Sequence, residues 1–289
     1  MNEHILNEWH LFSRVSFDKL IDARLQLHHA AQLAAAPGRH LLAPRRDDSH
    51  TNFFWSSQYQ AMLGEPVGEE YPLQGALRPA DLTILLIDEE DNIMEELPLN
   101  GKSLDEAFLW IKQQLSEKNV DTAKLNLKMP YELADHPVAK SKQFNFQSPS
   151  NFEELTKYWS NAHLLLCELV HITPNASPVR CWPHHFDIAT LITVKEHPIP
   201  EKTKSIGVGL SPGDESYPLP YFYVTPWPYP NVKSGLLPEL PGGGRWHTKD
   251  WVGAILTADN IVTQHSAEAQ IDQVDGFITS AVDAARKLL

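Results

Sequence analysis

The spacing of apolar residues predicts two long amphipathic helices in this chain. Between residues 17 and 36 apolar side chains recur every three or four positions, and Pro37-Gly38 is expected to end this first helix. Residues 152–171 repeat the pattern. A shorter helix is predicted at 103–115, where Ser103 and Glu106 have the spacing of a capping box, and a last helix at about 267–288.

The segments between these helices have the composition of β-strands. Residues 52–63 are rich in aromatic side chains and predict a strand, and residues 81–99 predict a hairpin because two apolar runs flank an acidic turn. Residues 179–190 predict a further strand, and residues 252–261 a second hairpin. The stretch 188–194 is free of charge and rich in β-branched residues, which indicates a buried strand.

The order helix, strand, hairpin, helix occurs twice and suggests an internal duplication. Sliding the first long helix onto the second places His28 on His163, and Trp55 of the first strand corresponds to Trp182 of the second. We therefore expect an α+β fold of two related halves, 1–124 and 151–289, joined by a linker at 125–150, around a mixed or antiparallel sheet core. The alternative to a duplication is that two unrelated α+β segments align by chance. The two halves could also form a single fused domain.

The second half also carries a long segment rich in proline, glycine and aromatic residues at 218–251. Residues 221–225 predict a short aromatic strand, but the prolines and glycines that follow exclude a central strand or a helix. A loop of this length is either a lid over an apolar pocket, using Trp227, Tyr229 and Trp246, or an ordered cover for the end of a sheet.

Composition and charge narrow the class of protein. The chain has 289 residues, 42% hydrophobic and 21% charged, which is typical of a soluble globular protein. The formal net charge of −13 would repel a phosphate backbone, so nucleic acid is not expected as a partner. Without a membrane-length apolar run or a leader-like N-terminus, we expect no membrane association and a cytoplasmic location. Cys167 and Cys181 are expected to be buried thiols, and a single disulfide between them is the alternative.

The candidate chemistry is concentrated in residues 177–194, where Trp182, His184, His185 and Asp187 interrupt an apolar run. An imidazole that meets Asp187 would act as a general base or a metal ligand, so His184, His185 and Asp187 are the catalytic candidates. Adding His28 or His163 to His184 and Asp187 would give two imidazoles and a carboxylate, a ligand set suited to Zn²⁺ or non-haem Fe²⁺. The competing interpretation is that these histidines only tie a strand to a helix.

Further residues are candidates for ligand binding. His28 and Gln32 lie four residues apart and would share one face of the first helix. Arg180 could clamp a carboxylate or phosphate group, or form a buried pair with Glu168 or Asp187. The full ligand-binding set consists of His28, Gln32, Arg180, Trp182, Tyr221 and Tyr223.

One further pattern combines a Leu-His-x3-Gln helix at 27–32, a Ser-Pro-Val segment at 177–179 before Phe-Asp-Ile-Ala at 186–189, a Gly-Asp turn at 213–214 and an aromatic-Tyr-Pro strand at 221–226. In this pattern the chain resembles a bacterial family defined by a domain of unknown function. This chain departs from the pattern at Pro183 and His185. The resemblance implies no activity, but it implies that His28, Gln32, His184 and Asp187 belong to one site. The matching positions are Leu27, His28, Gln32, Ser177, Pro178, Val179, His184, Phe186, Asp187, Ile188, Ala189, Gly213, Asp214, Tyr221, Phe222, Tyr223 and Pro226.

The sequence therefore favours a protein that binds a small molecule in a cleft between its halves, with or without turnover by a His/Asp site that a divalent metal could assist. The alternative is a non-catalytic module that binds another protein, or a second copy of itself as a homodimer, through the aromatic loop.

Overall fold

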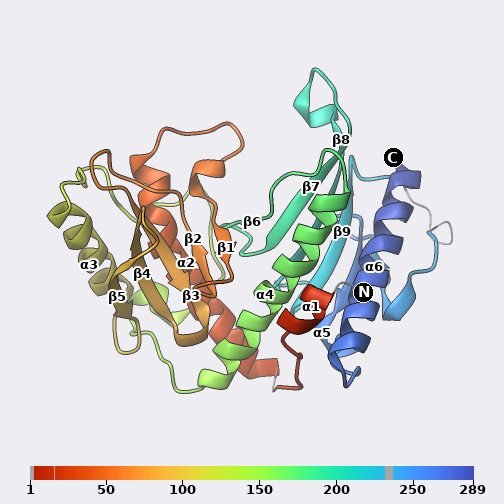
Figure 1. The fold of residues 1–289 in the computed structure, drawn as a ribbon, viewed down its shortest axis with the longest axis horizontal. Coiled ribbons are helices and arrows are strands. Elements are labelled where there is room, and N and C mark those ends of the chain that lie inside the picture. Colours follow the sequence, from red (N-terminus) through yellow and green to blue (C-terminus); the bar gives the residue numbers. More distant parts are fainter. Residues whose placement is uncertain (1–2, 16, 232–236) are drawn as a thin grey trace. The chain divides into compact units, whose positions relative to one another are not determined.

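The computed structural model describes residues 3–15, 17–231 and 237–289 and confirms an α+β protein with antiparallel sheets (Figure 1). The chain divides into two compact units. Unit 1 consists of Met1–Arg14, Lys157–Val179 and Asp187–Leu289, and unit 2 of Val15–Thr156 and Arg180–Phe186. Each unit is therefore assembled from segments that are distant in the sequence.

Unit 2 is built on an antiparallel sheet whose strands follow one another in chain order. These are β1 (Phe54–Ser56), β2 (Ala61–Leu63), β3 (Leu73–Arg78), β4 (Thr83–Asp88) and β5 (Ile93–Pro98). The pairing of β4 with β5 confirms the hairpin predicted at 81–99. Ala61, Leu63, Ala76, Leu85 and Ile87 form a buried apolar cluster on this sheet.

The predicted strand at 52–63 is wrong, because two short strands form a hairpin there. Phe54 pairs with Leu63 across the turn. The polar residues between the strands favour a turn, and Gln60 adopts a left-handed backbone conformation with φ of 49°. A polar turn thus divides the single strand that the aromatic content predicted into β1 and β2.

Two helices accompany this sheet, α2 (Phe17–Leu41) and α3 (Leu104–Glu117). Ser103 and Glu106 form the predicted capping box of α3. The helix α2 lies against β3, where a Cβ on Gly75 would stand 3.1 Å from the carbonyl oxygen of Ala34. Unit 2 also contains three short 3₁₀ turns, η1 (Ser49–Thr51), η2 (Pro79–Asp81) and η3 (Pro137–Lys140).

Helix α2 does not stop at Pro37, which corrects the boundary predicted from the sequence. Pro37 is buried inside the helix, and Gly38 lies so close to η1 that a Cβ would stand 2.4 Å from the carbonyl oxygen of His50. Tertiary packing on this last turn therefore outweighs the backbone hydrogen bond that proline removes.

Unit 1 contains a second antiparallel sheet. Within the unit its strands lie in the order β7 (Ile188–Lys195), β8 (Lys204–Ser211), β9 (Tyr221–Trp227), β11 (Gly253–Thr257) and β10 (Arg245–His247). The helix α6 (Ala267–Leu288) packs on β9 and β8 (Figure 1). The other described helices and turns are α1 (Glu3–Glu8), α5 (Ala258–Ile261), η4 (Pro200–Lys202) and η5 (Pro241–Gly243). The helix α4 (Pro149–Ile172) belongs to this unit from Lys157 onward.

Helix α4 confirms the second predicted long helix, and α6 confirms the last one. The predicted strand at 179–190 is in fact β6 (Arg180–Cys181) of unit 2, a turn, and then β7 of unit 1. Phe186, with φ of 60°, is the left-handed residue that ends this turn. Strand β7 is buried on one face only, since Leu191 remains 48% exposed.

The hairpin predicted at 252–261 is wrong, because helix α5 follows β11 directly. Ala258 and Ile261, spaced as on a helix, are both buried, and Asn260 donates to Thr257 Oγ1 at the start of the turn. Strand β9 confirms the short aromatic strand predicted at 221–225. The rest of the segment 218–251 is more regular than predicted, since it contains η5 and β10. Its residues 232–236 lie outside the described part of the chain.

Neither cysteine in the described structure is in a disulfide. Cys181 is buried as predicted, whereas Cys167, on α4, is exposed and corrects the prediction that both thiols are buried. Within the described residues, no helix has both the length and the apolarity that a membrane crossing requires.

Candidate functional site

The turn formed by residues 182–186 in unit 2 carries several of the predicted site residues and is fixed by helix α2. His28 Nε2 lies 2.9 Å from the carbonyl oxygen of Pro183, and Gln32 Nε2 donates to the same oxygen at 2.7 Å. Since a carbonyl only accepts, Nε2 of His28 carries the proton. The predicted common face of His28 and Gln32 is therefore confirmed, and both side chains hold the backbone of the turn.

The His28 ring is also packed against the end of the turn. It stacks on Phe186 with ring centroids 4.9 Å apart and planes 4° from parallel. The amide of Phe186 donates to the Trp182 carbonyl oxygen at 2.7 Å, which closes the turn. Burial lowers the pKa of His28 to about 4, so this imidazole is neutral at neutral pH. We assign His28 a positioning role.

His184 and His185 are presented on the outside of this turn. Both side chains are exposed, their ring centroids lie 4.3 Å apart, and neither imidazole has a hydrogen-bond partner within the described part of the chain. The rings of Trp182 and His184 meet edge to face with centroids 5.9 Å apart, and the Tyr131 and His184 ring centroids are 5.8 Å apart. We call Tyr131, Trp182, His184 and His185 the ring cluster.

The environment of His184 weakens the basicity of its imidazole. Partial desolvation and the neighbouring His185 lower the pKa of His184 to about 4. His184 is thus uncharged at neutral pH, with one ring nitrogen that donates and one that accepts.

Arg39 holds Tyr131 of the ring cluster in place, and the sequence analysis predicted neither residue. Arg39 Nη2 donates to Gln32 Oε1 and to the Tyr131 hydroxyl, each at 2.7 Å, and the Tyr131 hydroxyl donates to Gln32 Oε1 at 2.9 Å. Arg39 lies seven residues after Gln32 and so on the same helix face. This relation was not predicted because the predicted helix ended before Pro37. Tyr131 was not predicted because no periodic pattern in the sequence surrounds it.

The remaining predicted residues of the 182–187 segment and of β9 belong to a polar network in unit 1. Tyr223 donates from its hydroxyl to Asp187 Oδ2, and Tyr221 donates to Asp214 Oδ2 at 2.5 Å. Burial and the neighbouring carboxylates raise the pKa of both phenols, so both stay protonated. The two tyrosines share one face of β9 because they are two residues apart in a strand.

The metal candidates are distributed between the units. His163 lies in unit 1, where its ring nitrogens are 3.6 Å from Cys167 Sγ. Desolvation lowers the pKa of His163, and partial desolvation raises the pKa of the Cys167 thiol although the residue is exposed. His28 and His184 lie in unit 2 and Asp187 in unit 1. Among the described residues, no three or more His, Cys, Asp or Glu side chains are placed to hold a metal ion together. Arg180 is half-buried in β6.

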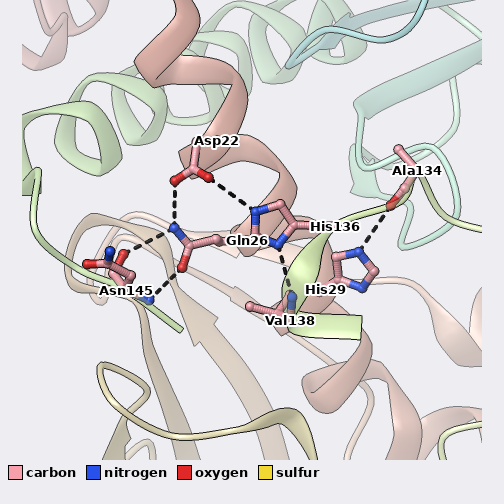
Figure 2. Close-up of polar contacts among 7 residues, drawn as sticks. All are labelled: Asp22, Gln26, His29, Ala134, His136, Val138 and Asn145. Atoms are coloured by element: carbon pink, nitrogen blue, oxygen red, sulfur yellow. Dashed lines mark hydrogen bonds and ion pairs between the residues drawn. The ribbon is translucent and has the colours of Figure 1, made fainter. Parts of the chain in front are cut away.

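A second polar region of α2 is structural. Figure 2 shows Gln26 bonded to the backbone of Asn145, with Nε2 donating to the carbonyl at 3.1 Å and Oε1 accepting from the amide at 2.7 Å. His136 Nε2 lies 3.1 Å from Asp22 Oδ1, while its Nδ1 accepts from the Val138 amide at 3.3 Å (Figure 2). Both nitrogens of His136 are therefore engaged, which removes it as a base or metal ligand. We call residues 126–145 the strap that α2 holds.

No protein-family model, no curated protein and no solved structure matches this chain.

Proposed function

We propose that the protein binds a small planar molecule on the ring cluster. The observation that carries this proposal is the contrast within one turn: His28 and Gln32 fix its backbone, whereas the exposed imidazoles of His184 and His185 have no hydrogen-bond partner within the described residues. Rings held rigidly at a surface provide stacking area with little loss of conformational entropy on binding.

Binding is favoured over catalysis by the chemistry of these groups. A general base works best when its pKa lies near the operating pH, and the pKa of His184 is lowered to about 4. Asp187 accepts a hydrogen bond from Tyr223 in unit 1. A metal-assisted or His/Asp-catalysed reaction thus has less support than binding alone.

The test is an NMR titration of protein with labelled histidine and tryptophan side chains, using benzamide, benzoate and indole as planar probes. We expect shifts at Trp182, His184 and His185, and their loss in the double variant His184→Ala/His185→Ala. His171→Ala, at an exposed histidine on α4, is the matched control and should bind as the wild type does. Shifts confined to other parts of the protein would contradict the proposal.

A second candidate function is protein recognition through the aromatic segment of unit 1. Trp227 and Tyr229 are 41% and 44% exposed and meet edge to face at 5.1 Å. Paired exposed aromatic rings are typical of protein interfaces. Replacing both with serine should abolish self-association in sedimentation experiments if a homodimer uses this surface, and should leave planar-probe binding unchanged.

The internal duplication also remains a proposal. It is supported by the order helix, antiparallel strands, helix, which runs from α2 to α3 in unit 2 and from α4 to α6 in unit 1. Membership of the family that the sequence resembles and a cytoplasmic location likewise stay predictions.

A further inference from the structure

Arg39 is a cation whose hydrogen-bond partners are all neutral. Its Nη2 donates to Gln32 and Tyr131, and its Nη1 is buried without a partner in the described structure. The Tyr131 ring lies beneath the guanidinium, 5.5 Å from Cζ. No carboxylate among the described residues forms an ion pair with Arg39.

This arrangement is unexpected in an acidic chain. The sequence has 37 acidic and 24 basic residues, and Arg78, on the same unit, bonds to both Asp81 and Glu96. Removing a cation from water is unfavourable unless a counter-charge replaces the lost solvation, and burial lowers the pKa of Arg39 accordingly. The protein therefore keeps an uncompensated positive charge next to Tyr131.

Tyr131 connects this charge to the ring cluster. Its hydroxyl accepts from Arg39 while its ring lies 5.8 Å from His184. Gln32 makes a second connection, because it accepts from Arg39 and donates to the carbonyl of Pro183 in the turn. The charge is thus held at a fixed place behind the rings.

We propose that the ligand of the ring cluster is a planar organic anion whose negative charge is attracted by Arg39. The inference rests on the proposed function and adds the charge class of the ligand. The anion does not have to touch the enclosed guanidinium, because charges attract over several ångströms where protein replaces water. The exposed, neutral imidazole of His184 supplies an N–H donor for the oxyanion.

Benzoate and benzamide test this inference, because they have nearly the same shape and differ in charge. Dissociation constants are measured by the NMR titration of the ring cluster at constant ionic strength. We expect benzoate to bind at least about tenfold more tightly than benzamide, a difference of about 1.4 kcal/mol. Arg39→Gln should remove the difference by weakening benzoate alone, and Arg39→Lys should retain part of it.

Arg78→Gln is the matched control, because it makes the same chemical change at an arginine that carboxylates already neutralise. It should leave both constants unchanged. Equal affinity of benzoate and benzamide at the ring cluster would overturn the anion inference and leave the proposed function standing. Shifts from neither probe would overturn both. If Arg39→Gln fails to fold, the wild-type comparison and Arg39→Lys still decide the outcome.

Discussion

At the scale of single residues, Gly209 determines how the Tyr223 hydroxyl reaches Asp187. A Cβ at Gly209 would stand 2.6 Å from the Ile188 carbonyl oxygen, 2.7 Å from the Tyr223 hydroxyl and 2.8 Å from the Ala189 Cβ. Gly209→Ala should therefore lower the free energy of unfolding by about 1–3 kcal/mol, the usual cost of overpacking, as measured by urea denaturation.

Gly276 in α6 provides the matched control for this substitution, because a Cβ there would meet nothing within 4 Å. Gly276→Ala should raise stability by about 0.5–1 kcal/mol through helix propensity. Equal effects at the two glycines would show that the contacts at Gly209 are not the cause.

His28 makes stability depend on pH. The imidazole has a pKa of about 4 in the folded protein, against 6.5 as its ordinary value, so between these values the unfolded chain binds more protons. Stability is then fully present above pH 6.5 and falls as the pH drops towards 4, by on the order of 3 kcal/mol for this group. His28→Gln should reduce that loss in urea titrations between pH 7 and 4, whereas His171→Gln should not.

At the scale of elements, one face of α2 holds the strap in place. Besides the bonds of Gln26 and Asp22, His29 Nε2 lies 3.2 Å from the Ala134 carbonyl oxygen and His40 Nε2 lies 3.1 Å from that of Lys128. Backbone groups of the strap that lie outside η3 thus find hydrogen-bond partners in the side chains of a helix.

Gln26→Ala tests this role of α2. The side chain is buried and makes both backbone bonds to Asn145, so its loss should lower stability by about 1–3 kcal/mol. Hydrogen exchange of the Asn145 amide should accelerate. Gln113→Ala, at an exposed glutamine on α3, should change neither quantity measurably, and a similar effect from both variants would contradict the assignment.

The elements that could be predicted from the sequence are those whose determinants are local. The capping box of α3 and the acidic turn between β4 and β5 depend on neighbouring residues, and both predictions are confirmed. The course of α2 past Pro37 depends on η1 packing against Gly38, which no local pattern contains. Because the predicted helix ended before Pro37, Arg39 was not recognised as a residue of α2 that faces the candidate site.

At the scale of the whole molecule, the two units are interleaved along the chain. Unit 2 takes Arg180–Phe186 from the middle of unit 1, and Phe53 pairs with Cys181 inside unit 2. The turn that carries Trp182, His184 and His185 therefore depends on pairing with a residue more than a hundred positions earlier in the chain. Pairings at this separation leave no periodic signal, and the approach of Tyr131 to His184 was unpredictable for the same reason.

The interleaving predicts that the N-terminal segment stabilises unit 1. Gln270 of α6 is fully buried; its Oε1 accepts from the Trp9 indole and the Phe12 amide, and its Nε2 donates to the Phe12 carbonyl at 3.1 Å. Phe12 also stacks on Tyr158 of α4 with centroids 4.1 Å apart. Gln270→Ala should therefore destabilise unit 1 by about 2–4 kcal/mol, because it leaves several buried backbone groups unpaired.

Hydrogen exchange resolved by segment is the measurement for this last prediction. Amides of α6 and β9 should exchange faster in Gln270→Ala, while those of β3 and β4 in unit 2 should keep their wild-type rates. Gln273→Ala on the same helix is the control, because the side chain of Gln273 donates one hydrogen bond, to the Gly242 carbonyl oxygen at 2.5 Å. Equal acceleration in both units would mean that they unfold together, and the N-terminal segment would then stabilise the whole chain.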